Sequence, residues 1–329
     1  MMKFKLIMPI LLLFFGCKTQ NQNMNIEKNQ TNPLLCDIET GVCETSENKE
    51  ISASSKIKVD SNLVKIIYFT DPICSSCWGI EPQLRKLKLE YGNHIFIEYR
   101  MGGLLPDWSY NSGGISKPSD VAHHWDEVSV YYDMPIDGDL WLEDPLDSSY
   151  PPSIAFKAAQ MQSQEKAILF MREIREMVFL HKINIAKSEN LEKAATEVGL
   201  DVEQFKSDFA NQAKIAFEED LKLGRDYGVR GFPTMFFIDN KGNKEMVYGL
   251  KPYAFYEMGV LKADNAIEKE EYRKDWETLF SKYNSLTAKE FAVLSGKPRT
   301  ECEQYLDKLV ADGKLEKLRT KNGSLWSKK

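Results

Sequence analysis

The chain has 329 residues, of which 43% are hydrophobic and 28% are charged, and its formal net charge is -6 at pH 7. This length exceeds one typical domain and predicts two or three folded units with a substantial apolar core. The acidic balance gives no reason to expect nucleic acid as the main partner.

The N-terminus has the pattern of an export signal. A short basic start precedes about a dozen apolar residues, a run too short for a transmembrane helix. Gly16 before Cys17 is similar to a bacterial lipoprotein cleavage site, where the cysteine becomes the lipid-bearing N-terminus. An ordinary signal peptide and an uncleaved anchor are the alternatives. We expect residues 1–17 to be a lipoprotein-type signal peptide, Cys17 to be lipidated and the protein to be anchored to a membrane on the periplasmic side of the cell envelope.

Residues 18–62 are rich in polar residues, lack periodic apolar positions and are predicted to be a flexible tether. Cys36 and Cys43 lie within this tether. In an oxidising compartment such a pair serves as a cross-link or as a redox couple. Cys36 and Cys43 are therefore either a second couple that exchanges electrons with Cys74 and Cys77, or a small structural disulfide, which is our preferred interpretation. A metal site is not expected because histidines are missing nearby.

A buried strand is predicted from residue 63 to Thr70, ended by Asp71-Pro72. Cys74-Ser-Ser-Cys77 follows at the start of a helical pattern, and a second strand is predicted at 95–101. Two strands joined by a helix form a right-handed βαβ unit.

The rest of the chain continues this α/β pattern and then leaves it. Helical periodicity from about 107 to 223 predicts an insertion, which is followed by a hairpin at 235–248 and by a helix at about 252–266. A charged helix is expected at 268–282. The region 284–329 reads as two helices and a hairpin around Asn322-Gly323, which predicts a small winged-helix-like module for protein contact.

Cys74 and Cys77 carry the chemistry that the sequence predicts. The thiolate is the reactive form of cysteine, and the N–H groups and dipole of a helix N-terminus favour negative charge. Cys74, the outer residue, is expected to be the thiolate that attacks, and Cys77 is expected to resolve the mixed disulfide. A structural disulfide and a zinc half-site are the alternatives, and the absence of a second pair at a zinc-like spacing disfavours zinc.

Three motifs point to a known family: residues 71–78 with the two cysteines, Gly102-Gly103-Leu104-Leu105-Pro106, and 144–152. With them, the chain from about 64 to 266 resembles the FrnE-like branch of the DsbA family in the thioredoxin superfamily. The resemblance implies a thioredoxin-like α/β fold with a helical insertion, covering about 63–267. It also implies a cis-proline at Pro233, with the backbone of Phe232 pairing with a substrate segment, and no cofactor beyond the dithiol.

On this basis we expect a thiol–disulfide oxidoreductase that acts on cysteine-containing proteins of the cell envelope with an unidentified redox partner. Two rivals exist on the same fold. The first is an adaptor resembling SpxH, which delivers another protein to a protease, tolerates loss of Cys74 and requires a cytosolic location. The second is a thiol-dependent isomerase of small molecules, a class that usually lacks the second cysteine.

Overall fold

The computed structural model describes residues 36–38, 40–44, 63–109 and 116–329. The predicted signal peptide, Cys17 and most of the predicted tether lie outside these residues. Within the described part of the chain, no helix combines the length and the apolar character needed to cross a membrane.

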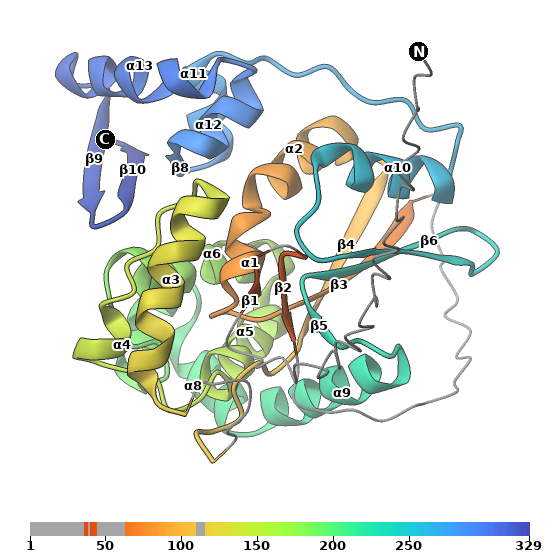
Figure 1. The fold of residues 1–329 in the computed structure, drawn as a ribbon. Coiled ribbons are helices and arrows are strands. Elements are labelled where there is room, and N and C mark those ends of the chain that lie inside the picture. The colour runs from red at the N-terminus through yellow and green to blue at the C-terminus, as the bar shows by residue number, and fades with distance from the viewer. Residues whose placement is uncertain (1–35, 39, 45–62, 110–115) are drawn as a thin grey trace, which may run out of the picture.

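A four-stranded sheet in the order β4-β3-β6-β7 forms the centre of the molecule. Strand β3 (Val64–Thr70) is parallel to β4 (Ile95–Met101) and antiparallel to β6 (Thr234–Ile238), which forms a hairpin with β7 (Lys244–Tyr248). In Figure 1, α2 and α10 lie above this sheet, and α5 and α9 lie below it. The expected thioredoxin-like α/β fold is therefore confirmed.

The helix after β3 is divided in two. Helix α1 (Ser75–Gly79) ends at Ile80, and α2 (Glu81–Tyr91) begins directly after it with Pro82 in its first turn. Proline is tolerated there because the first N–H groups of a helix have no intrahelical acceptor. Pro82 therefore lets the chain turn between the two helices without losing a hydrogen bond.

The expected helical insertion lies between β4 and β5 (Gly231–Phe232). Its helices are α3 (Pro118–Tyr132), α4 (Leu140–Glu143), α5 (Tyr150–Gln162), α6 (Gln164–Leu180), α7 (Ser188–Glu197), α8 (Val202–Ala210) and α9 (Gln212–Asp226). After the β6–β7 hairpin, α10 (Tyr253–Ala263) covers the sheet, with Gly259 against the ring of Phe237.

The C-terminal region has its own small core and a three-stranded sheet in the order β8-β10-β9. It consists of α11 (Trp276–Lys282), β8 (Ser285–Thr287), α12 (Ala288–Ser295), α13 (Arg299–Ala311), β9 (Leu315–Thr320) and β10 (Gly323–Lys328). The charged helix expected at 268–282 is wrong over residues 268–275, which are not helical. The Asp275 side chain accepts a hydrogen bond from the Thr278 N–H and begins α11, whereas the charged residues before it offer no apolar stripe to pack.

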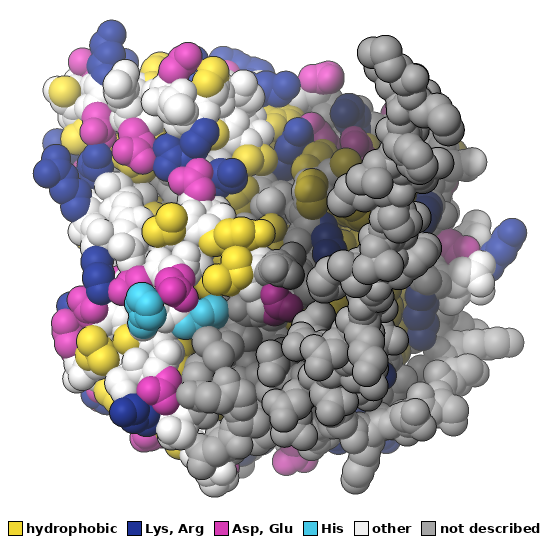
Figure 2. Space-filling model, viewed as in Figure 1, with side chains coloured by type: hydrophobic (Ala, Val, Ile, Leu, Met, Phe, Trp, Pro, Cys, Tyr) yellow, Lys and Arg dark blue, Asp and Glu magenta, His cyan; other side chains and the backbone are white. Residues whose placement is uncertain are grey.

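Positive and negative side chains are interspersed over this C-terminal region, at the upper left of Figure 2. Lys317 pairs with Asp307, and Arg299 pairs with Glu303 and with Asp133 of α3. Such mixed charge lacks the continuous basic face that nucleic acid would require.

A short hairpin lies within the segment that was predicted to be a flexible tether. Strands β1 (Cys36–Asp37) and β2 (Val42–Glu44) pair with each other, and β2 also pairs with β5. The described part of the tether is therefore held on the folded domain by a strand pairing that its polar composition did not indicate.

Candidate functional site at the helix cap

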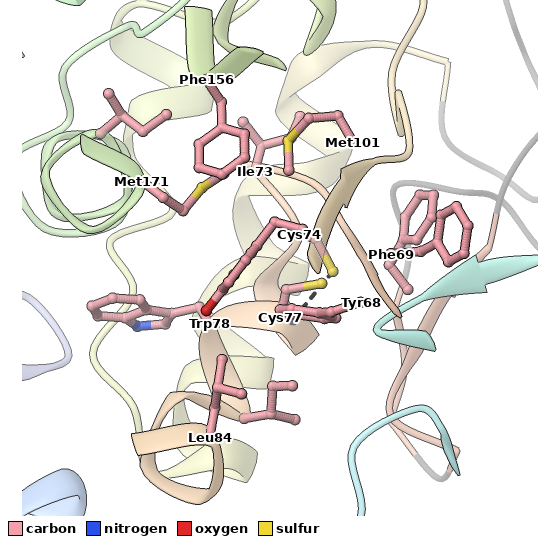
Figure 3. Close-up of a cluster of buried hydrophobic side chains, with 14 of the residues drawn as sticks. Tyr68, Phe69, Ile73, Cys74, Cys77, Trp78, Leu84, Met101, Phe156 and Met171 are labelled. Carbon is pink, nitrogen blue, oxygen red and sulfur yellow. Dashed lines mark hydrogen bonds between the residues drawn. The ribbon is translucent and has the colours of Figure 1, made fainter. Parts of the chain in front are cut away.

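Cys74 caps the N-terminus of α1, as the sequence predicts. Its sulfur accepts a hydrogen bond from the Cys77 N–H, with an N-to-Sγ distance of 3.2 Å. Figure 3 shows the two sulfur atoms next to each other, beside the Tyr68 ring and among buried apolar side chains. The structure thus brings the two predicted cysteines together at one helix tip.

Asp71 fixes the loop that carries these cysteines. Its carboxylate accepts hydrogen bonds from the Ile73 N–H at 3.0 Å, the Leu104 N–H at 2.8 Å and the Ser149 hydroxyl at 2.9 Å. These donors come from two of the motifs that carry the family resemblance and from the loop itself. Burial raises the pKa of Asp71 from 3.8 to about 6, although the three hydrogen bonds oppose this shift. The sequence analysis used Asp71 only as the end of a strand.

Arg175 of α6 is a second residue that the sequence analysis missed. Its side chain is fully buried, and its guanidinium donates to Glu81 at 2.6 Å, to the Thr70 hydroxyl at 2.7 Å and to the Asp71 carbonyl at 3.3 Å. A charged residue within the apolar stripe formed by Met171 and its helical neighbours was the available signal. A buried arginine in such a stripe requires paired acceptors.

The pKa values of the two thiols shift in opposite directions, and the shift at Cys74 is opposite to the one that a helix N-terminus favours. Burial raises the pKa of the Cys74 thiol well above its usual range, and the hydrogen bond to Cys77 adds to this effect. Burial also raises the pKa of Cys77, but the hydrogen bond from Cys74, the positive charge of Arg175 and the Thr70 hydroxyl together lower it below its usual range. In this arrangement the sulfur at the helix tip is covered, and the cation lies on the side of Cys77.

The backbone edge that the resemblance assigns to substrate lies beside the cysteines. The Phe232–Pro233 peptide bond is cis, as the resemblance implies. Gly102 makes room for the Phe232 ring, because a Cβ at Gly102 would lie 1.7 Å from the ring Cζ. β5, which contains Phe232, is a short strand. The edge of such a strand can bind an extended peptide.

That edge is occupied by the chain itself. In the register of β2 and β5, Cys43 lies opposite Phe232 and Glu44 lies opposite Gly231. Cys43 takes part in a disulfide, and its sulfur lies 3.3 Å from the sulfur of Cys74. Cys36 is opposite Cys43 in the β1–β2 pair. The hairpin that carries Cys36 and Cys43 therefore brings Cys43 into contact with Cys74 of the Cys74–Cys77 pair.

Both site sulfurs are closed off from solvent in this arrangement. The exposed fraction is 0% for Cys74 and 0% for Cys77. Cys74 is the outer residue at the N-cap of α1, and Cys43 lies against its sulfur. Cys302, by contrast, is a free buried cysteine in the small C-terminal core.

Comparisons with known proteins agree with this fold and differ from the expected activity. The family described as thioredoxin matches residues 68–258. A candidate protein disulfide isomerase from Nitrosomonas europaea superimposes with a TM-score of 0.53 at 20% identity, covering 61% of this chain and 97% of that one, which shows the fold alone.

Two relatives extend over most of the chain. The ClpXP adapter protein SpxH of Halalkalibacterium halodurans is 35% identical over 306 residues, covering 91% of this chain and 97% of the relative. The ClpXP adapter protein SpxH of Bacillus subtilis is 28% identical over 268 residues, covering 80% and 88%. The expected function of a disulfide oxidoreductase for envelope proteins is therefore wrong, since relatives that match almost end to end are adapters.

Proposed function

The chain belongs to the thioredoxin family, and from that premise we propose that it is an adapter that binds a client protein and presents it to a ClpXP-type protease. The observation that carries the proposal is the similarity to ClpXP adapters, which covers 91% of the chain and so extends beyond the thioredoxin match at 68–258. A shared enzyme fold alone would not require similarity beyond that match.

The state of the site supports an adapter over a turnover enzyme. A disulfide oxidoreductase needs an accessible, readily ionised sulfur. Here Cys74 is fully buried, its pKa is raised, and the edge that would bind a substrate strand is paired with β2. These features support a role in which binding surfaces, and not repeated thiol exchange on other proteins, carry the function.

The surface also supports protein contact. Exposed apolar side chains lie on α3, where Val130 is 77% exposed and Tyr131 is 55% exposed. The adjacent Asp133 pairs with Arg299 of α13, so this end of α3 and the C-terminal region form one continuous surface. Aromatic and apolar residues surrounded by charge are common at protein interfaces.

The adapter proposal requires this chain to be located in the compartment that holds the protease. An adapter must share a compartment with its protease, whereas the N-terminal leader predicts export and lipid attachment at Cys17. Cell fractionation combined with N-terminal mass mapping tests this point. The adapter proposal predicts a chain in the same fraction as ClpX, and a chain found only as a processed, lipid-bearing envelope protein would contradict it.

Capture of protease substrates tests the proposed activity. A ClpP variant without its active-site serine retains proteins that ClpX has delivered. We expect some retained proteins to be absent from cells that lack this chain, and to return with wild type and with Cys74→Ala. An unchanged set of retained proteins, or a return only with an intact Cys74 and Cys77, would argue for a different function.

A further inference from the structure

The N-terminal hairpin, defined here as residues 36–44, is docked on the site by several independent contacts. Besides the pairing of β2 with β5, the Leu250 N–H donates to the Gly41 carbonyl at 2.8 Å. Val42 and Cys43 are buried to 1% and 0% exposure. The hairpin is therefore a packed element of the site, and Cys43 is held at a defined position.

The hairpin turn is built for this position. The Gly41 N–H donates to the Asp37 carbonyl at 2.7 Å, and Gly41 has a φ of 65°, in the left-handed region that favours glycine. A Cβ at Gly41 would lie 2.5 Å from the Leu250 Cβ, and a Cβ at Gly249 would lie 2.3 Å from the Thr40 carbonyl oxygen. Two glycines thus allow the close approach of the two backbones.

The sulfur atoms are within reacting distance. Cys74 Sγ lies 3.3 Å from Cys43 Sγ, which matches the separation of about 3–3.5 Å that a near-attack arrangement requires. Ser76 is next to this contact, with its hydroxyl 3.6 Å from Cys43 Sγ and 2.7 Å from the Tyr132 hydroxyl. A merely structural disulfide would not need to lie against the free thiols of Cys74 and Cys77.

We propose that Cys43 is the internal exchange partner of Cys74, and that the N-terminal hairpin occupies the β5 edge as a built-in substrate whose disulfide passes to the Cys74–Cys77 pair. This inference goes beyond the adapter function and does not depend on it. It assigns to the dithiol a reaction within the chain, for which burial from solvent is no obstacle.

The exchange balances without any external oxidant. The Cys74 sulfur gives its proton to Cys77 and attacks Cys43 Sγ, so that a Cys74–Cys43 bond forms and the other sulfur of the Cys43 disulfide leaves as a thiolate. Cys77 then gives that proton to the departed sulfur and attacks Cys74 Sγ. The Cys74–Cys43 bond breaks, the Cys74–Cys77 bond forms and Cys43 leaves as a thiolate. The Cys43 disulfide has been reduced by two electrons, and the Cys74–Cys77 pair has been oxidised by two.

Removal of the resolving residue tests the proposal on the isolated full chain. Cys77→Ser stops the exchange at the mixed disulfide, so a peptide that links Cys43 to Cys74 should accumulate at alkaline pH, where hydroxide takes the Cys74 proton in place of Cys77. Acid quenching, alkylation and mass mapping detect this peptide. Cys74 should show a corresponding loss of alkylation. Cys302→Ala, which removes a buried free cysteine of the C-terminal core, should give the wild-type map. Full alkylation of Cys74 beside an intact Cys43 disulfide would overturn the proposal.

The docking is tested by a pair of glycine variants in the Cys77→Ser background. Gly41→Ala cannot approach Leu250 and should lower the linked peptide by about tenfold or more, because the sulfurs then meet only as an ordinary tethered pair. Gly313→Ala has a similar positive φ of 72° and no atom within 4 Å of the added Cβ, so it should retain the link. Equal amounts of linked peptide in both variants would contradict the role of the docked hairpin.

Wild type provides a measurement that does not depend on the folding of any variant. A chain that is oxidised by one equivalent per molecule should contain both isomers, one with the Cys74–Cys77 disulfide and one with the Cys43 disulfide. A single isomer that keeps Cys74 and Cys77 as thiols would overturn the proposal. No protease or client takes part, so this outcome is independent of the adapter tests.

Discussion

At the residue scale, Asp71 shows how a buried carboxylate can hold the site loop and still oppose stability at neutral pH. Three donors satisfy its oxygens, yet burial keeps its pKa at about 6 in the folded chain against 3.8 when unfolded. The folded state therefore binds this proton more tightly than the unfolded state. The stability that it contributes is present below pH 3.8 and is lost as pH rises through about 6.

The Asp71→Asn variant should remove this pH dependence. The free energy of unfolding of wild type relative to the variant should fall by roughly 2 kcal/mol between about pH 4 and pH 7, from 1.36 kcal/mol per pKa unit. Urea unfolding of both proteins at the two pH values measures the difference. Asp147→Asn, which changes an exposed carboxylate, is the control. A constant difference between wild type and Asp71→Asn would show that Asp71 does not titrate in this range.

The sequence was sufficient to place Cys74 and Cys77 together at a helix N-terminus, and the family resemblance implied the cis bond before Pro233. It was not sufficient to predict the surroundings of the two sulfurs. Arg175 and Cys43 reach the cysteines from α6 and from the N-terminal hairpin. The sequence pattern around a cysteine does not indicate which side chain from a distant segment covers its sulfur, or which guanidinium lies beside that sulfur.

At the scale of elements, segments with clear turn residues were predicted correctly, whereas short or highly charged segments were not. The β6–β7 hairpin and the β9–β10 hairpin lie where their turn residues predict them. The hairpin at 36–44 escaped prediction because its strands are only two and three residues long, and an isolated short hairpin is marginally stable. The region 268–275 was predicted to be helical from its composition, without an apolar face that could pack.

The position of β5 should depend on the absence of a side chain at Gly102. Gly102→Ala would place a Cβ 1.7 Å from the Phe232 ring, so the ring must move and take the β5 edge with it. We expect a loss of about 1–3 kcal/mol in the free energy of unfolding, as is usual for overpacking. Faster alkylation of Cys74 should accompany it, because the hairpin that covers Cys74 pairs with this edge.

Gly224→Ala is the matched control for this variant. Its added Cβ would make ordinary contact with Phe69 at 3.5 Å inside α9, where alanine is favoured over glycine by about 0.5–1 kcal/mol. Urea unfolding and the rate of thiol alkylation compare the two variants. Equal effects of the two substitutions would show that close packing at Gly102 does not position β5.

At the scale of the whole molecule, a buried ion network joins the C-terminal region to the helices around the site. Glu290 of α12 is fully buried and lies 3.2 Å from Arg85 of α2 and 2.9 Å from Arg172 of α6. Arg172 also lies over the Trp78 ring of α1, 4.4 Å from its centroid. The sequence predicted the C-terminal elements but not this junction, because its partners are more than 100 positions apart.

Because Glu290 lies at this junction, we expect Glu290→Gln to lower the free energy of unfolding strongly. Removing this charge leaves buried arginines without their main counter-ion, at a cost of about 3 kcal/mol. Urea unfolding and limited proteolysis at 264–275 should both show a loosened C-terminal region. Glu303→Gln, whose exposed side chain pairs only at the surface with Arg299, should cost little. If the two variants behave alike, Glu290 does not hold the C-terminal region.

The most direct test of the account is the degradation rate of a captured client by purified ClpXP, measured without this chain, with wild type and with Cys74→Ala. The adapter proposal predicts slow degradation of the client alone and a similar acceleration by both forms of the chain. No acceleration by wild type, or acceleration that disappears in Cys74→Ala, would contradict it.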